Sequence, residues 1–128
     1  MKKTLRTTFL VFILILGILG TSTVAFAAVN GEHFGRVNVS DEWTEIAYDT
    51  QGFDCNVKIT GLLTSVGPRI DVQMLDENGN VLWSENDSCP GLSSRVYRCG
   101  ADVYSIEVRV DSGVYGTASA LKTDEPAD

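Results

Sequence analysis

The sequence has little of what catalytic and metal sites are made from. It has one histidine, His33, and three cysteines in 128 residues. Serine and cysteine nucleophiles usually need a histidine base that a third group holds in place, and zinc sites use paired Cys or His ligands at short spacing. No C-x-x-C pair is present, and His33 stands only six residues into the expected mature chain. We therefore expect no catalytic residue, no zinc site and no cofactor.

Basic side chains are also scarce. The chain has 10 lysines and arginines against 17 aspartates and glutamates, a formal net charge of −7. Nucleic acids and anionic membrane surfaces carry negative charge, so this balance argues against both as partners. Hydrophobic residues make up 44% of the chain and charged residues 21%. We therefore expect one folded domain rather than a disordered chain.

The longest hydrophobic run, at residues 9–19, follows three basic residues within the first six positions. It is shorter than the ~20 residues that span a bilayer. Ala25 and Ala27 then supply the small residues that signal peptidase accepts before a cut. We predict a bacterial signal peptide at residues 1–27, cleaved between Ala27 and Ala28, with no stable membrane insertion afterwards. The protein is then secreted, or periplasmic if the host has two membranes.

Alternation of apolar and polar residues runs through the mature chain, most clearly at residues 53–60. There Phe53, Cys55, Val57 and Ile59 alternate with polar side chains. A period of two is typical of strands with one buried and one solvated face. The segments expected as strands are 34–39, 43–48, 53–60, 69–74, 81–83, 95–99, 104–110 and 114–120.

Turn residues separate these segments at intervals of about eight to twelve residues, as in sandwiches and barrels. Asn78-Gly79 is the strongest hairpin signal, because both residues tolerate positive φ. No long stretch of the mature chain has a helical period. The sequence therefore predicts an all-β antiparallel sandwich of about eight strands at residues 28–121. A flexible acidic tail is expected at residues 122–128.

Two segments resemble a known family. Residues 69–82, RIDVQMLDENGNVL, are similar to the central hairpin of bacterial pre-peptidase C-terminal domains and related jelly-roll modules. Residues 104–116, YSIEVRVDSGVYG, are similar to the strand, glycine turn and last strand that close those modules. The resemblance implies a noncatalytic extracellular β-sandwich of the jelly-roll type.

The three cysteines are an odd number, so at least one thiol is unpaired or bonded to another molecule. Export places them in an oxidising compartment. A Cys89–Cys99 disulfide would close a loop of about ten residues and stabilise the fold by ~2–3 kcal/mol. We predict this bond. Two alternatives stay open, namely that Cys55 pairs with one of the other two and that no bond forms.

Oxygen ligands crowd residues 76–87, and Asp76, Asn78, Asn80 and Asp87 are the residue types that calcium prefers. The first three have the spacing of an EF-hand loop. However, Val81 stands where that loop needs glycine, and Asp87 stands where it needs glutamate. We therefore expect no metal here and favour an acidic turn that keeps a sheet edge soluble.

Aromatic rings are the remaining route to a binding surface, because exposed rings stack on sugars or fill a partner's pockets. Trp83 and Tyr104 are expected to face the core. Tyr97 and Tyr115 have polar neighbours and form the predicted binding surface.

These features favour a noncatalytic protein that binds an extracellular protein or glycan. A secreted effector is one alternative, such as a bacteriocin or a protease inhibitor acting through a loop at residues 84–91. A minimal secreted hydrolase is another, because 17 acidic residues leave a carboxylate pair open. An exposed aromatic patch would favour the binding protein. A protruding loop around Cys89 would favour the inhibitor, and a cleft with two close carboxylates would favour the hydrolase.

Overall fold

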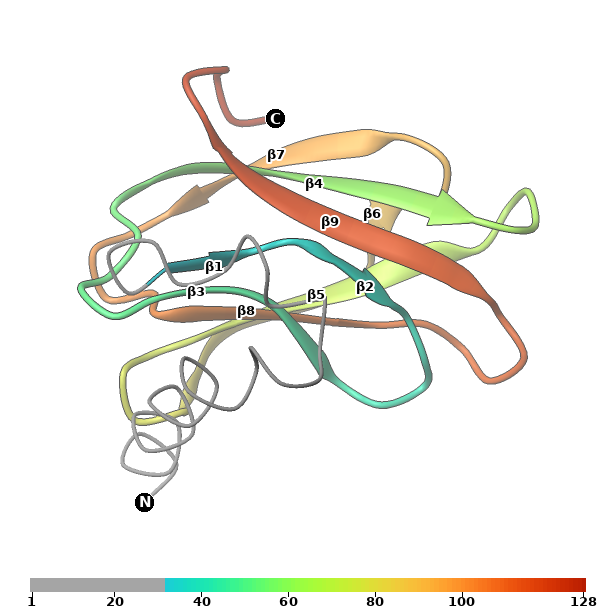
Figure 1. Ribbon diagram of the computed structural model, residues 1–128, viewed down its shortest axis with the longest axis horizontal. Coiled ribbons are helices and arrows are strands. Elements are labelled where there is room, and N and C mark those ends of the chain that lie inside the picture. Colours follow the sequence, from blue (N-terminus) through green and yellow to red (C-terminus); the bar gives the residue numbers. More distant parts are fainter. Residues whose placement is uncertain (1–31) are drawn as a thin grey trace, which may run out of the picture.

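The computed structural model describes residues 32–128, which form nine β-strands and no helix (Figure 1). The predicted signal peptide at residues 1–27 and its cleavage site lie outside the described residues. The strands are β1 (Glu32–Phe34), β2 (Arg36–Asn38), β3 (Thr44–Asp49), β4 (Cys55–Leu63), β5 (Arg69–Leu75), β6 (Val81–Pro90), β7 (Ser94–Cys99), β8 (Ser105–Arg109) and β9 (Gly116–Thr123). Within residues 32–128, no helix is long and apolar enough to cross a membrane.

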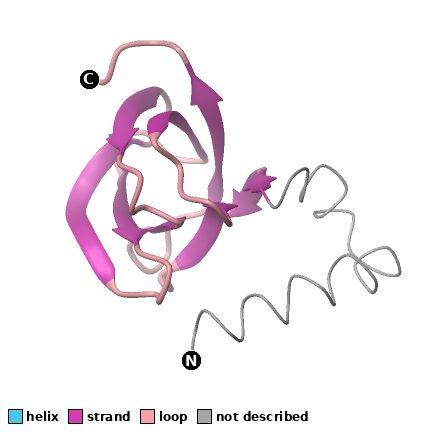
Figure 2. Ribbon diagram, turned by 90° about the vertical axis from the view of Figure 1, so that its left-hand side faces the viewer, coloured by secondary structure: helices cyan, strands magenta, loops and turns pink. Residues whose placement is uncertain are grey.

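The strands form two antiparallel sheets that face each other (Figure 2). Sheet I has the order β1-β3-β8-β5-β6, and sheet II has the order β2-β9-β4-β7. Only Gly35 separates β1 from β2, so one extended segment serves both sheets. Counted as one strand, it gives eight strands in the orders 1-2-7-4-5 and 1-8-3-6, the arrangement of a jelly roll. The predicted small antiparallel sandwich is confirmed.

The core lies between the sheets and follows the predicted alternation. Val57 and Ile59 of β4 are fully buried, and Ile70 and Val72 of β5 are buried against them from sheet I. Cys55 is half-buried and packs against the same cluster. The burial of apolar side chains from both sheets is the main stabilising contribution to a sandwich of this size.

The chain passes from sheet I to sheet II at the end of β6, directly under Gly61 of β4. A Cβ atom on Gly61 would lie 2.6 Å from the carbonyl oxygen of Pro90 and 2.8 Å from Cδ1 of Ile70. No real Cβ atom approaches a backbone oxygen so closely. Glycine is therefore required at this position for the crossing to pass close to β4.

Strand β6 is longer than the sequence predicted. The segment at residues 84–91, predicted as a loop, continues the strand as far as Pro90. The pairing with β5 shifts between Ile70 and Val72, at a bulge where Asp87 has a φ of 52°. Because β6 is an edge strand, its polar side chains face solvent, which gives the sequence the look of a loop.

The tail predicted to be flexible begins within a strand. Lys122 pairs with Val57, and Thr123 pairs with Asn56, so both belong to β9. Beyond β9, the carbonyl oxygen of Glu125 accepts a hydrogen bond of 2.8 Å from Nδ2 of Asn56. The boundary of the sandwich is therefore beyond residue 121, and the tail is in contact with sheet II.

Candidate binding groove

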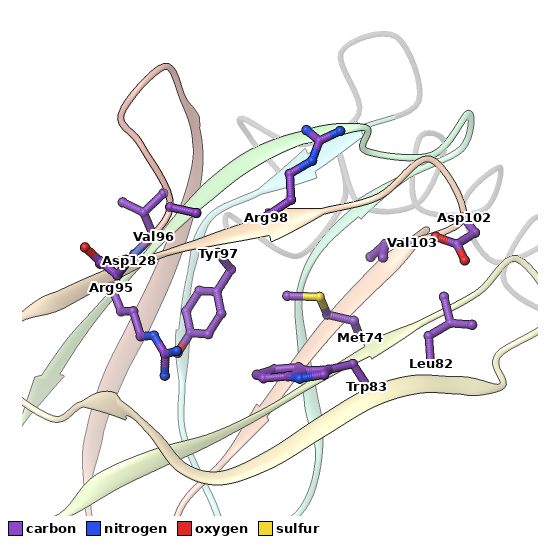
Figure 3. Close-up of a pocket in the computed structure, with 11 residues that line it drawn as sticks. Met74, Leu82, Trp83, Arg95, Val96, Tyr97, Arg98, Asp102, Val103 and Asp128 are labelled. Atoms are coloured by element: carbon purple, nitrogen blue, oxygen red, sulfur yellow. Dashed lines mark hydrogen bonds between the residues drawn. The ribbon is translucent and has the colours of Figure 1, made fainter.

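A groove of about 380 Å³ opens between β6 and β7, where the edges of the two sheets lie on the same flank of the sandwich (Figure 3). Its lining residues are Met74, Leu82, Trp83, Arg95, Val96, Tyr97, Arg98, Asp102, Val103, Ala127 and Asp128. The side chains of Met74, Trp83 and Tyr97 lie between the two edge strands (Figure 3).

Trp83 supplies the aromatic surface of the groove. Its register partner on β5 is Met74, so the indole turns toward the core and packs against it while staying half-buried. The rings of Trp83 and Tyr97 meet edge to face, with centroids 5.9 Å apart. Leu82 beside it is 43% exposed. The groove therefore has an apolar floor that solvent reaches.

Charged groups stand at both ends of this floor. Nη1 of Arg95 donates to Oγ of Ser88 at 3.0 Å and to Oε1 of Glu85 at 3.2 Å, which fixes the guanidinium 5.0 Å from the Tyr97 ring centroid. Asp102 is in the turn between β7 and β8, and it lies at the other end of the groove from Arg95 (Figure 3). The arrangement places a cation and a carboxylate on either side of an indole.

Tyr97, predicted to be exposed, is buried. Its side chain is 5% exposed, and its hydroxyl lies 3.0 Å from Oγ of Ser88, which is also buried. Burial raises the pKa of the Tyr97 hydroxyl well above its usual value. The prediction of an exposed ring was wrong because the polar neighbour Arg98 was given more weight than the alternation that turns Tyr97 inward with Cys99.

Tyr115, the other predicted binding residue, is 69% exposed in the connection between β8 and β9. Its carbonyl oxygen accepts a bond from the amide of Thr64, whereas Tyr97 pairs with Val57. Seven residues of chain separate Thr64 from Val57, about 23 Å at about 3.3 Å per residue. The structure therefore does not bring the two tyrosines into one site.

The predicted Cys89–Cys99 disulfide is absent, because both residues are free thiols. Cys89 is in β6 rather than in a loop, and its Sγ lies 3.6 Å from the carbonyl oxygen of Ile59. Cys99 lies opposite Cys55 in the β4–β7 register. Burial raises the pKa of Cys89 to about 11 and that of Cys99 to about 12. Both thiols are therefore protonated at neutral pH.

The four calcium candidates do not converge. Asp76, Asn78 and Asn80 form the turn between β5 and β6, where Oδ1 of Asp76 accepts bonds from the amides of Asn78 (2.9 Å) and Asn80 (2.8 Å). These bonds, the one from Asn80 first, lower the pKa of Asp76. Asp87 is seven residues further along β6 than Asn80, about 23 Å away. Among residues 32–128, no three His, Cys, Asp or Glu side chains lie close enough to hold a metal ion.

Carboxylates do gather in a second hollow, of about 300 Å³, lined by Asp41, Asp71, Asp87 and Asp111. Asp71 is the buried one, and both of its oxygen atoms are engaged. Oδ1 accepts the amide of Asp87 at 2.8 Å, and Oδ2 accepts Nε of Arg109 at 3.0 Å. These bonds hold the β6 bulge against β5 and β8, so the role of Asp71 is structural.

The sequence analysis did not predict that Trp83, Arg95 and Asp102 lie in one groove, because three separate segments of the chain supply them. The only signal was that two edge strands of a sandwich leave a gap between them. Comparison with known protein families, curated proteins and solved structures finds no match to this chain.

Proposed function

We propose that the mature chain is an exported, noncatalytic binding module that holds a glycan in the groove between β6 and β7. The observation that carries the proposal is the half-buried indole of Trp83, with Arg95 at one end of the groove and Asp102 at the other. The volume of about 380 Å³ lies within the range of small-molecule sites. Export rests on the signal peptide that the sequence predicts at residues 1–27.

The chemistry of a sugar suits these groups. One face of a pyranose ring presents C–H groups, which pack on an indole, while its hydroxyls both donate and accept hydrogen bonds. A hydroxyl would donate to the carboxylate of Asp102 and accept from the guanidinium of Arg95. Because Ser88 and Glu85 already hold Arg95 in place, binding would cost little side-chain entropy there.

The alternatives have less support. An inhibitor needs a rigid protruding loop, and residues 84–90 belong to β6 with Cys89 fully buried. A hydrolase of the usual kind needs two carboxylates that flank the substrate. In the carboxylate hollow, the one buried carboxylate, Asp71, is engaged at both oxygens, and Asp41, Asp87 and Asp111 are exposed. A protein partner is the other ligand class expected from the sequence, and the outer face of sheet II suits a protein better than the groove does.

The fluorescence of Trp83 gives a direct test. The Trp43→Phe variant leaves Trp83 as the only tryptophan of the chain, and it is screened against a glycan array and then titrated with each glycan that binds. Saturable binding with a change in Trp83 emission is expected. Asp102→Asn, at an exposed turn position, should weaken binding about tenfold or more while leaving the circular dichroism unchanged.

Trp83→Ala and Trp43→Ala form a matched pair, because each removes one half-buried indole from sheet I or its margin. Trp43 lies outside the groove, where Cζ of Arg109 is 4.3 Å from the centroid of its ring. Loss of glycan binding in the first variant alone supports the proposal. Equal loss in both, or binding of no glycan by the wild-type chain, contradicts it.

A further inference from the structure

Among the strands, acidic residues are confined to sheet I. Strands β2, β4, β7 and β9 of sheet II contain no aspartate or glutamate, although the chain has 17. The same strands contain five basic residues, which are Arg36, Lys58, Arg95, Arg98 and Lys122. The strands of sheet I contain seven acidic and two basic residues. Arg95 and Lys122 pair with the buried Ile59 and Val57, so they point inward and contact Glu85 and Asp49 of sheet I. The outer side of sheet II therefore has Arg36, Lys58 and Arg98, of which Arg98 pairs with Asp54 at 2.7 Å, and no carboxylate of its own strands, which favours an acidic ligand.

The register shows which of these side chains point away from the core. Val57 and Ile59 of β4 are buried inward, so Lys58, Thr60 and Leu62 point outward. Lys58 pairs with Val96 and Leu121, Thr60 with Ser94 and Ser119, and Leu62 with Thr117. Arg36 pairs with Ser119 from β2, and Arg98 of β7 pairs with Asn56. We call this surface the basic face.

Exposed apolar side chains lie on the same face. Leu62 is 43% exposed, and Leu92 is 52% exposed. The backbone bonds from Gly61 to Ser93 and from Leu63 to Gly91 continue the β4–β7 ladder and place Leu92 opposite Leu62. Leu121, 64% exposed, follows on β9. Leu62 and Leu92 thus form one exposed apolar pair beside the basic side chains, and Leu121 lies further along the face, opposite Lys58.

One acidic segment of the chain already lies against this face. Oε2 of Glu125 pairs with Nζ of Lys58 at 2.8 Å. The amide of Asp128 donates to the carbonyl oxygen of Val96 at 3.0 Å, and the amide of Val96 donates to Oδ2 of Asp128 at 2.7 Å. Val96 points outward with Lys58 and is nevertheless only 5% exposed. Residues 124–128 thus bind the edge strand β7 through main-chain bonds and the face through carboxylates.

We propose that the basic face docks an extended acidic polypeptide segment of a partner protein, and that residues 124–128 occupy its β7 end when no partner is bound. Charge complementarity selects the acidic partner. The bonds on both sides of Val96 select a polypeptide, because an added chain satisfies the amide and carbonyl groups of an edge strand together. The exposed leucines receive the partner's apolar side chains. This face adjoins the glycan groove proposed above and shares Val96, Arg98 and the tail residue Asp128 with it, whereas Trp83 and Asp102 of the groove lie outside the face. Peptide binding and glycan binding are therefore measured separately.

Competition between tail and partner gives the test. The probe is a fluorescein-labelled peptide with the sequence of residues 122–128, KTDEPAD, and binding to the mature chain is measured by fluorescence anisotropy. The double variant Glu125→Gln/Asp128→Asn weakens the tail's own contacts. The double variant Glu42→Gln/Asp111→Asn makes the same change in net charge at exposed positions outside the basic face.

The tail variant should bind the peptide about fivefold or more tightly than wild type, because apparent affinity rises with the fraction of open face. The control variant should bind as wild type does. Adding Lys58→Gln to the tail variant should remove the gain, and a peptide with Asn and Gln in place of its acids should not bind.

Three results would overturn the proposal. The first is equal peptide affinity in the two double variants. The second is binding of polygalacturonate, but not of the peptide, to the tail variant, which would assign the face to an acidic glycan. The third is a dimer in light scattering that the tail variant abolishes, which would assign the tail's seat to a second copy of the chain.

Discussion

The hydroxyl pair between Tyr97 and Ser88 ties β7 to β6 across the open flank, and its removal has a calculable cost. Tyr97→Phe keeps the ring against Trp83 and deletes only the oxygen that lies 3.0 Å from Oγ of Ser88. Ser88 is 1% exposed, so water cannot replace the lost partner. Losing one buried hydrogen bond of this kind costs about 1–2 kcal/mol in the free energy of unfolding.

Tyr115→Phe is the matched control, because it deletes the same atom from a ring that is 69% exposed. Urea denaturation of the reduced mature chain, followed by circular dichroism, measures both variants. The Tyr97 variant should lose about 1–2 kcal/mol, with a melting temperature lower by about 4–8 °C per kcal/mol. The control should change by less than about 0.5 kcal/mol. A smaller loss in the Tyr97 variant than in the control would refute the assignment of Tyr97 to the structure rather than to a binding surface.

The pH dependence of the same pair gives an independent check. Because burial raises the pKa of Tyr97 in the folded chain, the unfolded chain loses this proton first as the pH rises past about 10. The wild type therefore loses stability above that pH, and the phenylalanine variant lacks this contribution. The difference in the free energy of unfolding between the wild type and Tyr97→Phe should therefore become smaller from pH 9 to pH 11.

Three further predictions concern glycine and cysteine. Gly61→Ala should prevent folding or lower the free energy of unfolding by more than about 3 kcal/mol, because the added Cβ would lie 2.6 Å from a carbonyl oxygen. Gly113→Ala has open space around the added Cβ but a φ of 87°, so it should lower the free energy of unfolding by about 1 kcal/mol. Urea denaturation measures both variants. Under reducing conditions, stability should fall between pH 9 and 11, where the unfolded chain alone has lost the Cys89 proton, and Cys89→Ala should flatten that slope. Oxidation of the mature chain should lower its mass by two hydrogens, with peptide mapping that shows Cys55 joined to Cys99, because directly opposite residues on neighbouring strands meet the distance a disulfide needs; a bond to Cys89 would contradict this.

Alternation predicted most of the fold because each strand of a sandwich buries one face. Val57 and Ile59 show this on β4, and Ile70 and Val72 show it on β5. The same rule was available for Tyr97, which shares an inward face with Cys99, and the structure follows it. Where strand periodicity and the polarity of sequence neighbours disagree, periodicity decides, because neighbours along a strand point to opposite faces.

Other features could not be predicted, because they depend on which strands become neighbours. The acid-free composition of sheet II is present in the sequence, but its four strands are separated along the chain by the acidic strands of sheet I. The partner of Cys99 is set by the β4–β7 register, whereas sequence distance favoured Cys89. The polar residues of β6 resemble a loop in the sequence because β6 is an edge strand and most of its side chains are exposed to solvent.

The bulge at Asp87 has a consequence for molecules at high concentration. An exposed sheet edge can recruit a strand from a second molecule and begin a fibre. On β6, the left-handed residue Asp87 bends the edge out of line, and on β7, Asp128 occupies the amide and carbonyl of Val96. Growth by strand addition is therefore obstructed at both sheets on this flank. Removing the tail opens one of these edges, so the truncated protein should need dilution to remain dispersed.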